Sequence, residues 1–523
     1  MANVTNVATI SAMQALPPAA GLTVFLNANG REGLFECRAG TPPTADPLNG
    51  IYVTSGKSGF YWARVWDGVA GKPEWFGAVT GDGSTAARTA TLAALNAAVT
   101  LLPSVELASA TYYTNGTWRI SQSGRRVTGQ GRDKSAISSN HPTAHIIHCG
   151  GMPGAYYAER PLLCGMTLVR TVPATVPPSP NQDDDTGHAL HMRMTSNATV
   201  REVDTMGTID GSGKITGSNL VGTYWANALS PLWEDCFDLM TGQGARSYSF
   251  MLDGTQDDGL GPRFPSLIVF RAREVRMSNA GNAALSRGMI IIGSYTDMQV
   301  ERVETAKVHH GLLCLGGGSN AHFNSHWHDS YLADGIRIDK TGADSGDNLT
   351  LVDCYSAPGV GATGQPITLI NAQNVQIVAA QIAAFPGGGN GKIGVLFSNC
   401  INCTISGQVV NHSTGVKFDK CFGCNADVKV MQLAGPATEG IRVQGGFGNT
   451  ARCGIVGVPK SVGFQTGVAI AASGGNQIDL TGVIDSAVTN RLTIDGKAIA
   501  NAGNAPASNF VIRPGAAFNA AAS

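Results

Sequence analysis

The chain has 523 residues, a formal net charge of −1, 43% hydrophobic residues and only 14% charged residues. A net charge near zero excludes a general attraction to nucleic acid or anionic lipid, and the high apolar fraction excludes intrinsic disorder. No run of 18 apolar residues suggests a membrane-spanning helix, and the first residues, MANVTNVATI, do not resemble an export signal.

We expect residues 1–75 to form a small β-rich module. The segments GLTVFLNANGREGLFECRAG and GIYVTSGKSGFYWARVWDG alternate aromatic and polar residues between Gly, Asn and Pro turns, as short strands do. Residues 76–103 combine a turn-rich junction, FGAVTGDGS, with a predicted helix. Ser84 or Thr85 can cap the start of this helix, and Pro103 follows its end.

A glycine-led phrase recurs along the second half of the chain. Each glycine opens a β-type segment such as MIII, IRID or VKFD, and an Asn, Asp or Cys follows nine positions after most of these glycines. The glycines lie 21 to 27 residues apart, except for one interval of 59 that the segment ITLINAQN divides in two. They are Gly288, Gly311, Gly335, Gly394, Gly415, Gly440 and Gly467.

A period of 20 to 50 residues is typical of solenoids, in which each turn buries its apolar face only by stacking on its neighbours. The repeat therefore predicts an all-β fold, a parallel β-helix over residues 104–490 that carries insertion loops. The helix predicted just before it would cover the open end of its core. Residues 491–523, rich in Ala, Asn and Gly, are expected to form a C-terminal cap or tail.

The longest departure from the repeat spans residues 204–287, and long insertions on a rigid scaffold are where binding usually occurs. This insertion is one of two candidate sites. Its candidate residues are Glu234, Asp235, Asp253, Asp257 and Asp258, with Trp233 and Arg263 nearby.

Two patterns resemble metal sites, but we predict no metal and no cofactor. Cys400, Cys403, Cys421 and Cys424 match a four-cysteine zinc signature. The repeat by itself places them in two stacked columns, so we interpret them as corner-filling residues. His322, His326 and His328 are also close in sequence, without an evident set of supporting residues. The eleven cysteines are expected to be reduced thiols, because an odd number in a long chain does not indicate a disulfide framework.

Alignment of the rungs on the polar residue yields the second candidate site. In five rungs an inward apolar pair follows this residue at +1 and +3, for example Met298 and Val300. Position +5 then holds Glu202, Arg302, Ser325, Asp353 and Ala379, and position +7 holds Asp204, Glu304, Trp327, Tyr355 and Gln381. Glu304, Trp327 and Tyr355 are thus expected to stack in consecutive rungs.

Carboxylates beside an aromatic platform suit a groove that binds or cleaves sugars. Aromatic rings pack on the C–H faces of pyranose rings, and carboxyl groups donate and accept the protons of hydrolysis. We predict three catalytic carboxylates, Glu304, Asp329 and Asp353. The predicted substrate-binding residues are Trp327, Tyr355, His328, Arg302, Glu202 and Asp204. A lyase would instead need a base and a cation near a uronate, for which Arg302, Arg337 and the histidines are available.

The segment EWFGAVTGDGSTAARTATLAALNAAV resembles the opening of the pectate-lyase-like β-helix superfamily, although Ala86 and Ala87 stand where that pattern has an acidic pair. GLFECRAGTPPTADPLNGIYVTS is similar to the N-terminal modules of bacteriophage tailspikes. The resemblance implies a right-handed parallel β-helix, a homotrimer and a bacterial surface polysaccharide as substrate. It implies no particular catalytic residue.

From the residues and this resemblance together we predict a polysaccharide depolymerase of the virion, assembled in the host cytoplasm and attached to the phage tail by residues 1–75. Glycoside hydrolysis is favoured. The alternatives are a non-catalytic receptor-binding spike and a polysaccharide lyase acting by β-elimination. No nucleic acid and no membrane insertion are expected.

Overall fold

The computed structural model describes residues 4–152, 154–175, 187–240, 247–255, 267–279, 286–341, 348–384, 392–433, 437–457, 464–471, 476–479, 490–494, 497–498 and 510–513. The chain divides into two compact units: residues 1–241 with 258–261, and residues 242–257 with 262–523. Among the described residues, no helix is both long and apolar enough to cross a bilayer.

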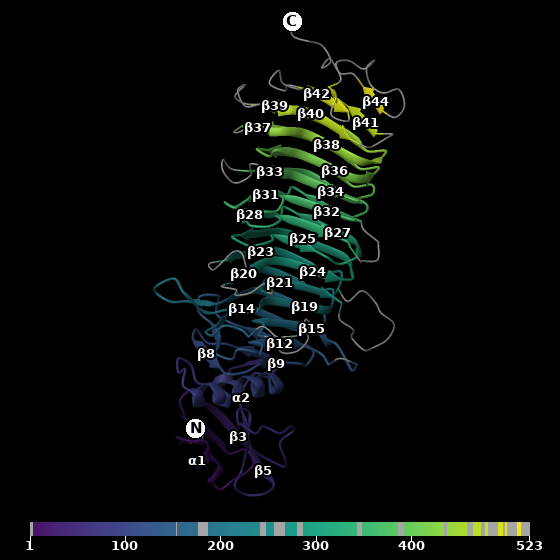
Figure 1. The fold of residues 1–523 in the computed structure, drawn as a ribbon. Helices are drawn as coiled ribbons and strands as arrows, with labels where there is room; N and C mark the ends of the chain where they lie inside the picture. Colours follow the sequence, from purple (N-terminus) through teal and green to yellow (C-terminus); the bar gives the residue numbers. More distant parts are fainter. Residues whose placement is uncertain are drawn as a thin grey trace. The chain divides into compact units, whose positions relative to one another are not determined.

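The first unit begins with a five-stranded sheet of order β1-β2-β3-β5-β4 (Figure 1). Its elements are β1 Thr5–Val7, α1 Ile10–Gln14, β2 Thr23–Leu26, β3 Gly33–Ala39, β4 Tyr52–Thr54 and β5 Phe60–Arg64. Met13, Val24, Phe35 and Trp62 form its buried core. These side chains give the sheet a core of its own. The buried Arg64 also donates hydrogen bonds to backbone carbonyls of the preceding turns.

The predicted helix is present as α2, Thr85–Leu101, and the Ser84 hydroxyl caps it by accepting from Ala87 N at 3.3 Å. It packs on the first coils, where Trp118 Nε1 donates to Leu95 O at 3.0 Å. The elements between the N-terminal sheet and the long strands are β6 Ala70–Gly71, η1 Pro73–Phe76, β7 Ser104–Glu106, β8 Thr111–Thr114, β9 Trp118–Ile120, β10 Arg126–Thr128 and β11 Ala136–Ser139.

The rest of the first unit is a parallel stack of coils with one hairpin, β17–β18. Its elements are β12 Ile147–Gly150, β13 Ala158–Glu159, β14 Leu162–Arg170, β15 Leu190–Ser196, β16 Thr199–Met206, β17 Thr208–Ile209, β18 Ile215–Gly217, β19 Val221–Leu229 and β20 Leu232–Met240.

The second unit is also coiled, and its strands form three parallel faces (Figure 1). The first face contains β21 Ser247–Gly254, β24 Ser286–Gly293, β26 Leu312–Cys314, β29 Ile336–Asp339, β32 Ile367–Ile370, β34 Ile393–Ser398, β36 Thr414–Phe422, β38 Ala437–Phe447, β40 Phe464–Ala471 and β42 Asn490–Ile494. The second face contains β22 Leu267–Ile268, β27 Gly318–Asn324, β30 Leu349–Val352, β41 Asn476–Asp479 and β44 Phe510–Arg513, with the first parts of β23 Arg271–Asn279, β25 Tyr295–Ala306, β33 Val375–Ala383, β35 Thr404–Val410, β37 Asn425–Gln432 and β39 Thr450–Gly457.

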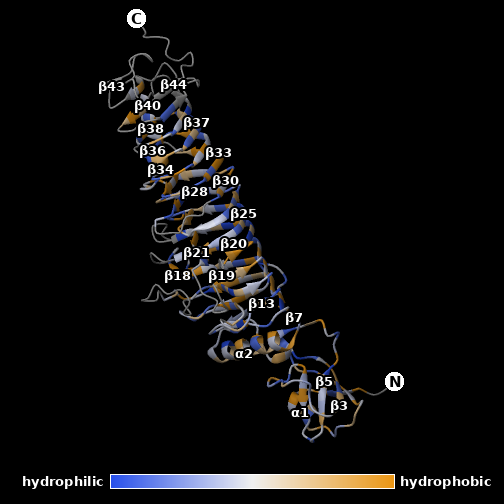
Figure 2. Ribbon diagram, turned by 90° about the vertical axis from the view of Figure 1, so that its right-hand side faces the viewer, coloured by the Kyte–Doolittle hydropathy of each residue, from blue (hydrophilic) through white to orange (hydrophobic). Residues whose placement is uncertain are grey.

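The third face consists of β28 Trp327–Tyr331, β31 Tyr355–Pro358 and the second halves of the long strands. A short antiparallel strand, β43 Lys497–Ala498, pairs with β42. Apolar and polar residues follow one another along the strands (Figure 2), and the inward pairs expected at +1 and +3, such as Ala321 and Phe323, are buried. The prediction of a parallel β-helix is confirmed. Most of residues 491–523, the predicted cap, lie outside the described residues.

The repeated glycines are required by the close approach of neighbouring coils. A Cβ on Gly288 would lie 2.5 Å from Gly311 O, and one on Gly311 would lie 2.5 Å from Gly335 O. Neither residue has a left-handed φ. Steric contact between neighbouring rungs, rather than a positive φ, therefore excludes a side chain at these positions.

Each cysteine column continues into the next coil. Cys421 pairs in register with Gly446, and Cys424 N donates to Asn449 Oδ1 at 3.0 Å. The four thiols are buried and lie within hydrogen-bonding distance of backbone carbonyls, for example Cys400 Sγ and Leu369 O at 3.4 Å. The ten cysteines whose side chains the structure describes are free thiols.

Candidate functional site

The structure brings the predicted carboxylate–aromatic column together on the third face of the second unit. Glu304 on β25 pairs in register with Trp327 on β28, Trp327 pairs with Tyr355 on β31, and Tyr355 pairs with Gln381 on β33. The rings of Trp327 and Tyr355 are 5.4 Å apart at an angle of 38°. Equal offsets in the sequence therefore do become neighbours in adjacent coils.

A left-handed residue explains why position +7 faces outward. Arg302, Ser325, Asp353 and Ala379, all at +5, have φ between 50° and 56°. Strict alternation from the buried residues at +1 and +3 would place +7 inside. The left-handed residue turns the corner between the second and third faces and shifts the alternation by one position. Position +6 is consequently buried, as in Val303, and +7 is the outward position.

We call the surface formed by Glu304, Trp327, Asp329, Asp353 and Tyr355 the aromatic edge. Trp327 is 54% exposed, which is unusual for so large an apolar side chain. Tyr355 is half-buried, and burial and then the nearby Asp329 raise the pKa of its phenol. An exposed indole beside a half-buried phenol forms a flat platform on which an apolar ring face can pack.

The three predicted catalytic carboxylates are all exposed but differ in position. Glu304 Oε2 lies 3.6 Å from Arg276 Nε, in a pair whose side chains are 57% and 59% exposed. Asp329 lies two residues after Trp327 on the same strand and pairs in register with Ala306. Asp353 lies at the corner, two residues before Tyr355.

His328 was predicted to contact substrate, and the structure contradicts this prediction. Its side chain is fully buried, and its Nδ1 lies 2.8 Å from Thr305 Oγ1. Because the left-handed Ser325 shifts the alternation, His328 and His326 both point into the coil. They are interior residues.

Arg302 is exposed and forms an ion pair with Glu274 in the preceding coil. In the same two coils Arg273 pairs in register with Glu301, and Arg276 pairs with Glu304. The charges on this side of the aromatic edge are thus mutually compensated. Arg302 remains a candidate for substrate contact.

Glu202 and Asp204 belong to the first unit, on β16. Glu202 occupies the equivalent left-handed position, with a φ of 53°. Asp204 Oδ1 lies 3.4 Å from Arg132 Nε and accepts from Phe237 N at 3.0 Å. Burial raises the pKa of Asp204, against the opposing effect of Arg132. These contacts give Asp204 a structural role, and its prediction as a substrate ligand is not supported.

The described residues of the candidate site in the insertion lie in different surroundings. Trp233 is fully buried, Asp235 lies 2.8 Å from Arg132, and Asp253 is 1% exposed. Glu234 lies on β20 of the first unit, whereas Asp253 lies on β21 of the second. Asp257, Asp258 and Arg263 lie outside the described residues.

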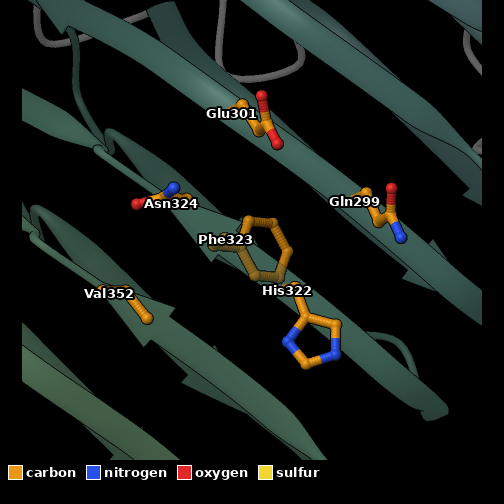
Figure 3. A pocket seen from close by; sticks show the side chains of 6 residues that line it. All are labelled: Gln299, Glu301, His322, Phe323, Asn324 and Val352. Atoms are coloured by element: carbon orange, nitrogen blue, oxygen red, sulfur yellow. The ribbon is translucent and has the colours of Figure 1, made fainter.

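An open pocket of about 340 Å³ lies on the second face, next to the corner that carries Arg302 and Ser325. Figure 3 shows its lining residues, which are Gln299, Glu301, His322, Phe323, Asn324 and Val352. Glu301 and Asn324 directly precede the left-handed corner residues. Both lie at position +4 of their rungs, four residues after Asp297 and Asn320, so the spacing of the repeat identifies them.

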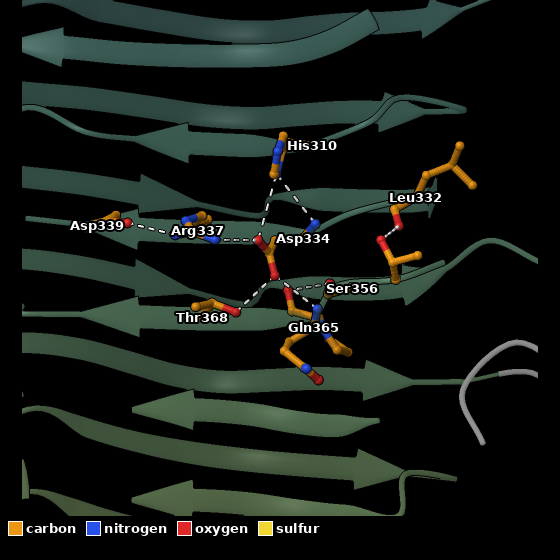
Figure 4. Close-up of polar contacts among 10 residues, drawn as sticks. His310, Leu332, Asp334, Arg337, Asp339, Ser356, Gln365 and Thr368 are labelled. Carbon is orange, nitrogen blue, oxygen red and sulfur yellow. Dashed lines mark hydrogen bonds and ion pairs between the residues drawn. The ribbon is translucent and has the colours of Figure 1, made fainter. Parts of the chain in front are cut away.

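A buried polar cluster surrounds Asp334, between the third and first faces (Figure 4). Asp334 is 5% exposed and accepts hydrogen bonds from Gln365 N at 2.9 Å and Thr368 Oγ1 at 3.0 Å. Arg337 bridges Asp334, at 3.3 Å, and Asp339, at 2.7 Å. Because this carboxylate is fully engaged, we assign the cluster to stability. Arg337 is occupied by two carboxylates rather than available to a uronate.

The interior histidines predict acid-sensitive stability. Burial lowers the pKa of His326 and of His412 to about 4, from an ordinary value near 6.5. Below pH 6.5 the unfolded chain therefore binds more protons than the folded chain does. The free energy of unfolding keeps its full value above pH 6.5 and falls as the pH drops toward 4. For His326 the loss is on the order of 3 kcal/mol. We expect Tm to fall between pH 7 and pH 4.5.

The slope of Tm against pH measures this effect. His326→Gln should reduce the slope, whereas the exposed His322→Gln should leave it unchanged. An equal slope in His326→Gln and the unaltered chain would show that His326 does not titrate as its burial requires.

The fold is similar to those of solved phage proteins. The N-terminal fragment of gene product 12 from bacteriophage phi29 has a TM-score of 0.51 and 11% identity, over 84% of this chain and 74% of that one. Tailspike protein 2 of an Escherichia coli O157:H7 bacteriophage has a TM-score of 0.35 and 13% identity, over 94% and 55%. The gp42 tailspike of Acinetobacter phage vb_AbaP_AS12 has a TM-score of 0.41 and 11% identity, over 92% and 69%.

Identities this low show a common fold alone. The present chain spans 55% of the length of the Escherichia coli phage tailspike. Neither a scan against protein-family models nor a search of curated proteins finds a match. The chain thus has a parallel β-helix fold, as its sequence resemblance implied, and this fold is similar to that of the N-terminal fragment of phi29 gene product 12.

Proposed function

We propose that this chain is a phage tailspike that binds and cleaves a bacterial capsular or exopolysaccharide at the aromatic edge, by glycoside hydrolysis. The observation that carries the proposal is the stacking of Glu304, Trp327 and Tyr355 in consecutive coils, with Asp329 beside Tyr355. An exposed aromatic pair flanked by carboxylates matches the chemistry of sugar cleavage.

Glu304 and Asp329 are the best-placed pair. They lie one coil apart and two residues apart along the strand, because Glu304 is in register with Trp327. With strands about 4.8 Å apart and a rise of about 3.3 Å per residue, their Cα atoms are separated by about 8 Å. Inverting glycosidases place their two carboxyl groups about 6.5–9.5 Å apart, so carboxyl groups separated about as far as these Cα atoms would suit inversion. In our proposal one carboxyl group protonates the glycosidic oxygen and the other activates water.

Hydrolysis is favoured over elimination because the two arginines considered for a lyase, Arg302 and Arg337, already form ion pairs with carboxylates. A lyase needs a free cation on the uronate carboxylate. Arg302 is paired with Glu274, and Arg337 is held by Asp334 and Asp339. The carboxylates of the aromatic edge, in contrast, are exposed.

The test is incubation of the purified chain with capsular or exopolysaccharide from hosts of its phage. Hydrolysis releases reducing ends without ultraviolet absorbance, whereas elimination creates an unsaturated uronate that absorbs. Release of products that absorb ultraviolet light would show that the chain cleaves by β-elimination and not by hydrolysis. Glycan binding without any new reducing ends would leave a non-catalytic spike.

One observation favours that non-catalytic alternative. Glu304 is 57% exposed, and its ionic neighbour is Arg276, itself 59% exposed. General acids of glycosidases are commonly found in drier surroundings. A receptor-binding spike would use the same aromatic edge to hold glycan.

Substitution of Trp327 tests whether the aromatic edge is the surface that binds oligosaccharide, both for a cleaving spike and for a non-catalytic one. Removing an exposed indole that packs on a sugar ring costs about 1–2 kcal/mol, so Trp327→Ala should weaken oligosaccharide binding by about 10-fold. Phe422→Ala removes a similarly exposed ring, 51% accessible, from another part of the same unit. Calorimetric titration should show a loss in the first variant and not in the second.

We further propose that residues 1–75 attach the chain to the phage tail and that three copies assemble side by side. The separate core of the N-terminal sheet supports an independent attachment module. Light scattering of the purified chain tests the trimer, and a mass of one chain would contradict it.

A further inference from the structure

The first unit contains a buried group of histidines that the proposed function does not use. His145 follows β11, His148 lies on β12, His188 precedes β15, and His191 lies on β15. His145, His188 and His191 are only 1% to 2% exposed. We call these four residues the histidine cluster.

The cluster converges from separate segments onto one point. One ring nitrogen from each of His145, His188 and His191 lies within 4.8 Å of the others. The rings of His145 and His191 stack 4.2 Å apart, and those of His145 and His188 are 4.8 Å apart. We propose that this is a binding site for a divalent first-row transition metal, with zinc as the expected ion.

The donor set selects the class of metal. Neutral imidazoles suit zinc, nickel, copper and cobalt, whereas magnesium and calcium require oxygen ligands. Cys149 lies on the inward side of β12, opposite to His148 along the strand, and is fully buried within the coil, so it is not a competing ligand.

The fit requires movements of the rings. Zinc–nitrogen bonds of about 2.0–2.1 Å in a tetrahedral site place ligand atoms about 3.4 Å apart. The ligand nitrogens now lie within 4.8 Å of one another, and the stacked rings of His145 and His191 must rotate so that their nitrogens point at one ion. Nε2 of His191 is buried and has no hydrogen-bond partner among the described residues. Its Nδ1 is 2.7 Å from Nδ1 of His148, which can supply or support the fourth ligand.

The surrounding structure holds the ligands in place. His148 and His191 are in register on neighbouring coils, and Tyr224 follows in the next coil. The Tyr224 ring lies 4.8 Å from His191 and 5.0 Å from His188. It therefore closes one side of the cluster.

A buried arginine fixes the two ligands that lie outside strands. Arg170 donates to His188 O at 3.0 Å and to Ala144 O at 2.9 Å, next to His145. Its Nε also donates to Asn219 Oδ1 at 2.9 Å. The positive charge of the guanidinium lowers the affinity of the cluster for a cation. The hydrogen bonds that Arg170 donates to these acceptors, however, position the segments that carry His145 and His188.

The expected role of the metal is to fasten irregular segments to the coil. His148 and His191 alternate with the interior residues Ile147, Cys149 and Leu190 along their strands, so they lie on the outward side. His145 and His188 cover them from connecting segments. A metal at this point would join these segments to β15 and stabilise the folded chain.

The test uses the full chain without a histidine tag, stripped with EDTA and titrated with zinc or cobalt. We expect one tight equivalent per chain, a cobalt complex with the strong visible absorption of four-coordinate ions, and a higher Tm with zinc. His188→Gln combined with His191→Gln should weaken the tight equivalent at least 100-fold. His412→Gln, which alters a buried histidine of the second unit, should leave it unchanged.

If the double variant does not fold, His145→Gln alone provides the comparison, because His145 lies outside the strands. Absence of a tight equivalent in the unaltered chain overturns the proposal. So does a tight equivalent that folded cluster variants retain, since the ion then binds elsewhere.

Discussion

Glu304→Gln and Asp329→Asn are each expected to abolish cleavage of the host polysaccharide, lowering kcat/KM by about 10²- to 10⁴-fold. The amide keeps the size of the carboxyl group but can neither donate its proton to the glycosidic oxygen nor deprotonate water. Both side chains are exposed, and Glu304 has only a solvent-accessible ion pair with Arg276. Such pairs contribute about 0–1 kcal/mol, so Tm should change little.

The matched control is Asp427→Asn. Asp427 lies on the second face of the same unit, is 56% exposed and has an accessible arginine, Arg452, at 3.7 Å. Its substitution should leave kcat/KM unchanged. Full activity in both Glu304→Gln and Asp329→Asn would refute the assignment of the aromatic edge, whereas loss of activity in the control as well would indicate a general effect of charge.

Gly311→Ala is expected to destabilise the second unit by about 3 kcal/mol, because the added Cβ would clash with the neighbouring coil. The added Cβ would lie 2.5 Å from both Gly335 O and His328 Nδ1. Neither contact is relieved easily, because Gly335 O accepts the Leu312 N hydrogen bond at 2.8 Å and His328 is fully buried. Overpacking of this kind typically costs about 1–3 kcal/mol, and displaced backbone hydrogen bonds add to it.

Differential scanning calorimetry and limited proteolysis measure this effect without assuming two-state unfolding of so long a chain. Gly415→Ala should behave in the same way, since its Cβ would lie 2.5 Å from Gly440 O. Gly211→Ala is the control, because nothing lies within 4 Å of its added Cβ. A Gly311→Ala chain as stable as this control would show that the coils separate without cost.

The column of the aromatic edge could be predicted because it depends only on spacing. Trp327 and Tyr355 are equally far from the polar residues that open their rungs, and the coils are in register. The orientation of their neighbours could not be predicted in the same way. His328 points inward because Ser325 adopts a left-handed φ and shifts the alternation, and Ser325 carries no sequence signal for that conformation.

The histidine cluster had no signal in the repeat. His148 and His191 are 43 residues apart, in coils that precede the regular glycine phrase. His145 and His188 belong to connecting segments, whose length varies from coil to coil. Only the packing of these segments on the sheet brings the imidazoles together.

The amino-acid sequence by itself determined the coiled architecture and the vertical alignment of side chains, because equal offsets from the polar residue of each rung become vertical neighbours when the coils lie in register. The tertiary structure alone decided which side chains face solvent beyond each corner and which loops cover the sheet. A single left-handed residue at a corner changes which side chains face solvent beyond it. Long-range contacts outside the periodic pattern decide which loops cover the sheet.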